Sequence, residues 1–213
     1  MAKKATRKKS KVDPRDAIID AALTLAAERG WSNLTLNDIA EAAGLSLANV
    51  HGQFGSKTAI LRAFQRRVDR AVLAEDPDLE ADEPVRDRLF DVLMRRFDAL
   101  IPYRAGLAAV LQDQCRDPLA ALCLAPQFRR SMAAMLEAAG LSATGCRGAV
   151  RLDGLALIYL MALRTFFRDE SDDLAKTMAA LDRHLTRADR AIGNLRRMRC
   201  PKGRKTAENR PSA

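Results

Sequence analysis

The chain has 213 residues, of which 48% are hydrophobic and 30% are charged. This length suits one large domain or two small ones that share a core. The longest apolar stretch, residues 155–163, is too short to cross a bilayer, and no hydrophobic segment follows the basic N-terminus. The sequence therefore predicts a cytoplasmic protein without membrane insertion.

Positive charge gathers at the two ends of the chain, although the net charge is only +9. Residues 1–12 hold six basic side chains and no acid, and residues 196–213 hold seven basic side chains and one acid. We expect a disordered basic arm over 1–12 and a disordered basic tail over 197–213. Such segments attract nucleic acid, and the alternative is a pair of solubilising tails.

Helical patterning accounts for almost everything after residue 13, because Ala, Leu, Arg and Glu dominate and no alternating strand pattern occurs. The first helix should begin at Pro14, with Asp13 as its N-cap, and end at Gly30. The second should begin after Thr35, whose hydroxyl can form a capping box with Asp38.

A tight turn, Gly44-Leu45-Ser46, precedes a short third helix over about 47–54. Two short helices joined by a turn with Gly predict a helix-turn-helix motif, whose second helix fits the major groove of DNA. A fourth helix follows to about residue 74. Further helices are expected near 84–100, 102–115, 118–139, 144–168 and 172–196.

Residues 29–46, followed by Val50, Phe54, Ser56 and Lys57, resemble the signature of the TetR family. The resemblance spans about residues 14–64. It implies an all-α fold, with a three-helix helix-turn-helix DNA-binding domain over 13–60 and a helical ligand-binding and dimerisation domain over 61–196.

The same resemblance assigns contacts with double-stranded DNA to individual residues. Thr35 and Lys57 would bind phosphates, and His51 stands where the family usually has Tyr. Asn49 is the best candidate for hydrogen bonding to a base edge, and His51 could instead be an ordinary surface histidine. The full predicted set is Thr35, Asn37, Leu47, Ala48, Asn49, His51, Gly52 and Lys57.

The helix over 144–168 is apolar nearly all round, which is natural in a homodimer and difficult in a monomer of this size. Large flexible side chains in the middle helices are candidates to line a site for a small hydrophobic ligand, with Arg104 or Arg164 available for an acidic group. Side chains of this kind are more often ordinary core, which is the alternative. The candidates are Met94, Phe97, Tyr103, Leu107, Phe128, Met132 and Met135.

A second, weaker resemblance covers residues 164–185, which are similar to the C-terminal end of ubiquinone-biosynthesis lipid-binding proteins of the same fold. It implies a lipid or isoprenoid-like ligand. The main prediction is a ligand-responsive repressor that binds a pseudo-palindromic operator as a dimer, and the alternative is a lipid-binding accessory protein that does not act through DNA.

Catalysis and metal binding find no support in the sequence, since nucleophile elbows, phosphate-binding loops and zinc-ligand spacings are all missing. We predict no enzyme activity, no cofactor and no metal. The four cysteines, Cys115, Cys123, Cys146 and Cys200, are expected to be free thiols that mostly fill the core. A thiol redox sensor is the alternative.

Overall fold

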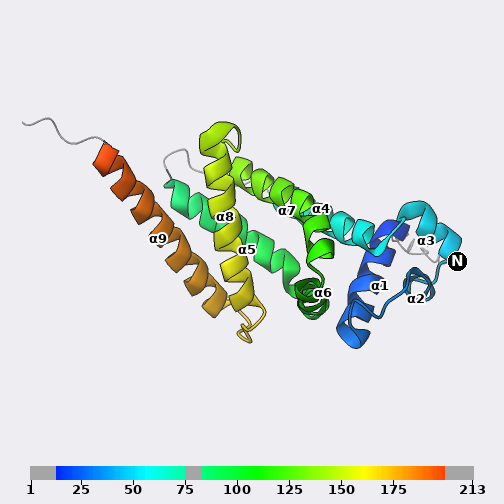
Figure 1. Cartoon of the computed structure of the whole chain (residues 1–213). Helices are drawn as coiled ribbons and strands as arrows, with labels where there is room; N and C mark the ends of the chain where they lie inside the picture. Colours follow the sequence, from blue (N-terminus) through cyan, green and yellow to red (C-terminus); the bar gives the residue numbers. More distant parts are fainter. Residues whose placement is uncertain (1–12, 75–82, 200–213) are drawn as a thin grey trace, which may run out of the picture.

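The computed structural model describes residues 13–74 and 83–199, and every regular element in these ranges is helical (Figure 1). A short 3-10 turn, Ile101–Tyr103, separates α5 from α6. The α-helices are α1 (Pro14–Arg29), α2 (Leu36–Ala42), α3 (Leu47–Gln53), α4 (Lys57–Ala74), α5 (Val85–Leu100), α6 (Arg104–Arg116), α7 (Pro118–Ala138), α8 (Gly145–Phe166) and α9 (Ala175–Arg199).

The predicted signals at the helix ends of the N-terminal domain are confirmed. The Asp13 side chain accepts a hydrogen bond from the Arg15 N–H, and Gly30 ends α1 with a φ of +80°. Thr35 and Asp38 form the reciprocal capping box at the start of α2. These local hydrogen bonds satisfy N–H groups that a helix start leaves unpaired, so short helices can begin at defined residues.

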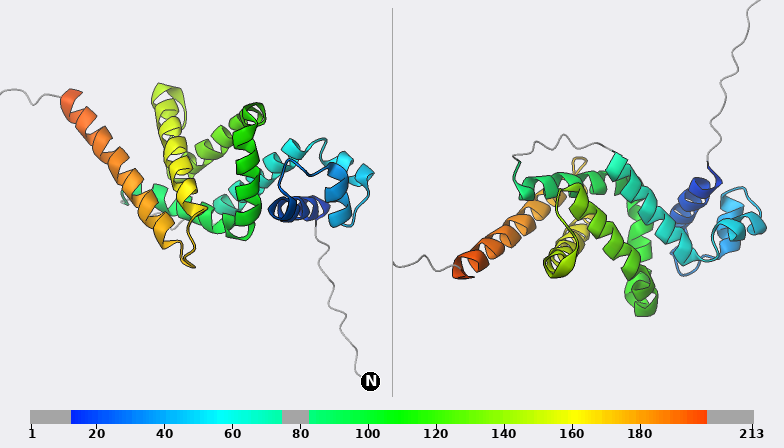
Figure 2. Two further views of the ribbon diagram at one scale, coloured as in Figure 1. Left: turned by 60° about the horizontal axis from the view of Figure 1, so that its bottom comes forward. Right: turned by 90° about the horizontal axis from the view of Figure 1, so that it is seen from above.

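The helix α4 connects the N-terminal helices to the middle of the molecule. The helices α1, α2 and α3 gather at one end, α8 and α9 lie at the other, and α4 runs from the first group to the central helices α5 and α7 (Figures 1 and 2). The predicted domain boundary between residues 60 and 61 lies inside this continuous helix. The N-terminal and C-terminal parts therefore share one rigid element, and their buried side chains form one continuous cluster.

The last helix begins three residues later than the predicted 172, at Ala175. The buried Asp169 carboxylate explains this start, because it accepts hydrogen bonds from both the N–H and the hydroxyl of Thr177 at 2.7 Å. These bonds and those from Ser171 lower the pKa of Asp169 far below its ordinary value, against the opposing effect of burial. Asp169 and Ser171, which lie within the segment with the lipid-protein resemblance, thus cap the N-terminus of α9.

The prediction that the cysteines mostly fill the core is wrong for the three described residues. Cys115, Cys123 and Cys146 are all free and exposed. Cys200 and the two predicted basic segments, apart from residues 197–199 in α9, lie outside the described residues. Among the helices that are described, none is long and apolar enough to cross a membrane.

Candidate nucleic-acid interface

A tight turn sets the geometry of α2 and α3. Gly44 has a φ of +67°, a left-handed conformation that glycine adopts without the strain a Cβ would bring. This conformation lets the Leu45 N–H donate to the Ala40 carbonyl at 2.9 Å. Val50 and Phe54 bury the inner side of α3 against the domain core. The turn and these two apolar anchors fix which face of α3 points outward.

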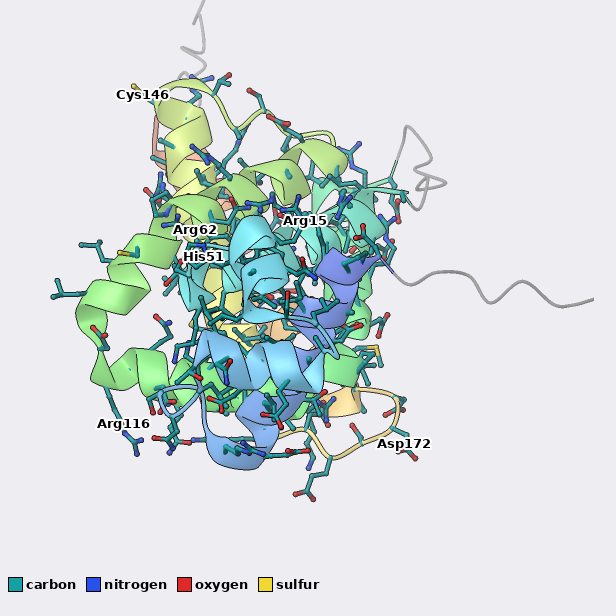
Figure 3. All side chains as sticks on the ribbon, turned by 90° about the vertical axis from the view of Figure 1, so that its right-hand side faces the viewer. Arg15, His51, Arg62, Arg116, Cys146 and Asp172 are labelled. Atoms are coloured by element: carbon teal, nitrogen blue, oxygen red, sulfur yellow. The ribbon has the colours of Figure 1, made fainter. Side chains whose placement is uncertain are left out.

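The outer face of α3 carries the side chains that the sequence predicts as DNA contacts. The Ser46 hydroxyl caps the helix by accepting from the Asn49 N–H at 3.2 Å. Figure 3 looks onto this end of the molecule, with His51 labelled. The predicted residues Leu47, Ala48, Asn49, His51 and Gly52 are all exposed, as is Asn37 on α2.

Thr35 has a structural task in addition to its predicted phosphate contact. Its N–H donates to the Asp38 carboxylate at 2.7 Å, and its hydroxyl donates to the same oxygen at 2.5 Å. These bonds lower the pKa of Asp38 below the ordinary value. The capping box thereby holds the start of α2, from which Asn37 projects.

Lys57 begins α4 and reaches back to the turn between α1 and α2. Its Nζ donates to the Trp31 carbonyl at 2.8 Å and to the Ser32 carbonyl at 3.4 Å, and it lies 5.4 Å from the centre of the Trp31 ring. Burial lowers the pKa of Lys57, while the charges of Asp113 and Asp38 act in the opposite direction. The ammonium is thus held in place within the N-terminal domain.

Sequence reasoning missed Arg15 at the start of α1. Its guanidinium lies 5.2 Å from the centre of the Phe54 ring, so a cation stands beside the C-terminal end of α3 (Figure 3). The two residues are far apart in the sequence, and no local pattern signals their contact. Only the packing of the N-terminal helices brings them together.

The predicted ligand-lining residues separate into two groups. Phe97 and Phe128 gather around Tyr159 of α8, with ring centres 5.3 and 5.9 Å from it. Tyr103 instead contacts Phe64 of α4, at 5.1 Å. Phe97, Met132 and Met135 are fully buried, whereas Met94, Tyr103, Leu107 and Phe128 are half-buried against the core.

A buried polar cluster, which the sequence analysis also missed, lies beside the group around Tyr159. The Arg96 guanidinium of α5 donates to the Asp69 carboxylate of α4 and, at 3.2 Å, to the Tyr159 hydroxyl. The Ser131 hydroxyl of α7 donates to the same carboxylate at 2.5 Å. Helical spacing after Val92 could have placed Arg96 on the buried face of α5. Four helices are thereby joined at one point.

Two arginines considered for an acidic ligand group have different surroundings. Arg104 donates to the Asp169 backbone carbonyl, and its guanidinium lies 4.5 Å from the centre of the Phe166 ring. Arg104 therefore ties α6 to the turn between α8 and α9. Arg164 is exposed near the end of α8.

Comparison with known proteins supports the resemblance seen in the sequence. The family model for bacterial regulatory proteins of the tetR family matches residues 18–64. The regulator AlkX of Mycobacterium tuberculosis is 36% identical over 69 residues, which cover 32% of this chain and 33% of AlkX. BetI of Agrobacterium fabrum is 47% identical over 47 residues, which cover 22% of this chain and 23% of BetI. The match to these relatives therefore spans a third or less of their length.

Likeness to solved structures extends much further along the chain. A TetR transcriptional regulator from Nitrosomonas europaea has a TM-score of 0.68 and 29% identity, with 83% of this chain and 99% of that one covered. A TetR regulator from Rhodococcus, with a TM-score of 0.60 and 21% identity over 81% of this chain and 94% of that one, shows the same fold. Residues 18–64 thus match the tetR family of bacterial regulatory proteins, and most of the chain has the fold of solved TetR regulators.

Proposed function

We propose that this chain is a transcriptional regulator, a ligand-responsive repressor in the cytoplasm that binds a pseudo-palindromic operator as a homodimer. The exposed outer face of α3 is the observation that carries the proposal. This helix has a capped start, a buried anchor on its inner side and another at its C-cap, and six exposed residues. A helix held in this way can enter the major groove without losing its packing.

Asn49 is the residue on this face best suited to read a base, because its amide can form two hydrogen bonds with adenine. Leu47 and Ala48 offer apolar contacts to thymine methyl groups. Lys57 and Arg15 supply positive charge at the edges of the same face. The basic arm over residues 1–12 adds a sequence-independent attraction to DNA, and deleting residues 1–11 should flatten the salt dependence of binding.

An exposed apolar strip on α8 supports the dimer. One side of α8 is buried in the protomer, while Val150, Leu157 and Leu160 remain 74%, 59% and 45% exposed. Ile192 on the neighbouring α9 is 47% exposed. Pairing α8 and α9 of two copies about a two-fold axis would cover this strip and set two copies of α3 on successive major grooves, about 34–36 Å apart.

A selection from a random-sequence pool of duplex DNA tests the proposal. The purified chain should enrich a pseudo-palindrome and bind it in the presence of nonspecific competitor DNA, with two protomers per duplex. Replacing Asn49 with Ala should cost about 1–3 kcal/mol of discrimination at one base pair of each half-site. Gln112→Ala, an exposed change on α6, is the matched control and should leave the selected sequence unchanged.

If the chain bound DNA only weakly and without sequence preference, and if deleting residues 1–11 abolished this binding, the result would count against the proposed regulator function. The lipid-binding alternative would then be the better account. We also propose a small hydrophobic effector, and we expect it to bind at the apolar group that Phe97 and Phe128 form around Tyr159. Such a ligand can regulate DNA binding only if it prefers one conformation of the dimer.

A further inference from the structure

The C-terminal end of α6 contacts the turn between α1 and α2 through one carboxylate. Asp113 accepts a hydrogen bond from the Ser32 N–H at 2.6 Å, and its side chain is only 14% exposed. Ser32 belongs to the turn between α1 and α2. This hydrogen bond to the backbone lowers the pKa of Asp113 below its ordinary value. A helix of the C-terminal part thus fixes a turn of the N-terminal part.

Lys57 holds the other side of the same peptide group. Its Nζ donates to the Trp31 carbonyl, and the Trp31 carbonyl and the Ser32 N–H are the two polar ends of one peptide unit. A trans peptide is planar and stiff, with these two groups pointing in opposite directions. The carboxylate, the peptide and the ammonium therefore form a continuous chain, in which each hydrogen bond polarises the next.

We infer that Asp113 is a positioning residue for Lys57 in the DNA complex, an inference that rests on the proposed function. An ammonium group has three N–H donors. The Trp31 and Ser32 carbonyls take two of them, which leaves one for a DNA phosphate oxygen. Asp113 fixes the peptide that orients the ammonium, and the position of α6 thereby controls a phosphate contact made by α4.

The N-terminal end of α6 links this contact to the C-terminal helices. Arg104 donates a hydrogen bond to the Asp169 carbonyl, in the turn that joins α8 to α9. Those two helices carry the proposed dimer surface, and Figure 2 shows α6 between them and the N-terminal helices. A displacement of α6 relative to α1 would move the Asp113 carboxylate that accepts from the Ser32 N–H.

Affinity for the selected duplex, measured by fluorescence anisotropy, tests the role of Asp113. Asp113→Ala removes the acceptor and should weaken binding by up to about tenfold, because the loss of affinity is limited by what one hydrogen bond to a charged group contributes. Asp113→Asn retains an acceptor oxygen and removes a negative charge near DNA, so it should bind at least as tightly as the parent. Gln112→Ala on the same helix should change nothing.

Repeating the measurement in a Lys57→Met variant distinguishes a positioning role of Asp113 from a general loss of structure. Lys57→Met should lower the slope of log affinity against log salt concentration by about 0.9, the value for one phosphate contact. In this background Asp113→Ala should cause no further loss of affinity. An equal loss in both backgrounds would overturn the inference, as would tighter binding by Asp113→Ala.

Trp31 gives a readout that needs no DNA, because it is the only tryptophan of the chain and is buried beside Lys57. Its emission should shift in Asp113→Ala and Lys57→Met but remain unchanged in Asp113→Asn and Gln112→Ala. Unchanged emission in Asp113→Ala would refute the link between α6 and Lys57. If the parent chain selects no duplex, the proposed function fails, and the emission still tests the contact itself.

Discussion

Replacing Gly106 with Ala should separate α1 from α6 and destabilise the protein. A Cβ on this residue would lie 2.2 Å from the Leu23 carbonyl oxygen and 2.9 Å from the Leu23 carbonyl carbon. Both atoms are backbone, so no rotamer change can relieve the contact, and the helices must move apart by at least about 0.8 Å. Overpacking of this kind costs about 1–3 kcal/mol, and the clash with backbone places this substitution at the upper end.

The higher helix propensity of alanine offsets about 1 kcal/mol of that cost. We therefore expect a net loss of about 2 kcal/mol in the free energy of unfolding, measured by urea denaturation at one fixed protomer concentration. Gly52→Ala is the matched control, because a Cβ on Gly52 would meet nothing within 4 Å, and it should gain up to about 1 kcal/mol. If Gly106→Ala proved as stable as the parent, the close packing of α1 on α6 would be refuted.

Three further changes test other parts of the structure. Arg96→Met should cost about 3–5 kcal/mol of stability, because it leaves the Asp69 carboxylate buried without its charge partner, and Arg96→Met with Asp69→Leu should recover much of the loss. Calorimetry of the single and the double variant checks this, and an equal loss of stability in the two would contradict it. Asp169 has a depressed pKa in the folded state, so its contribution to stability is present above about pH 4 and is lost as the pH falls below that value. Asp169→Asn should therefore be less stable at neutral pH and show a flatter acid dependence in unfolding titrations; an unchanged acid dependence would argue against the cap. Leu157→Asp should shift the chain toward monomers in sedimentation velocity and weaken operator binding, and a variant that stays dimeric would place the interface elsewhere.

Local signals in the sequence determined the helices and much of the candidate DNA-binding face. Helix caps act over three or four residues, so Asp13, Thr35 and Gly30 could be identified without knowledge of distant contacts. The same holds for the turn at Gly44 and for the exposed side of α3, because its two anchors follow the helical period. These features depend on hydrogen bonds and periodicity that one short segment contains in full.

Tertiary structure alone decided which distant residues share a site. Asp113 meets the Ser32 N–H across 81 positions of sequence, and Arg15 lies over Phe54 although neither segment signals the other. Exposure of the cysteines was mispredicted for a related reason, since residue type gives only an average tendency toward burial. A carboxylate or a guanidinium finds its partner through the packing of whole helices, and this packing depends on every apolar contact at once.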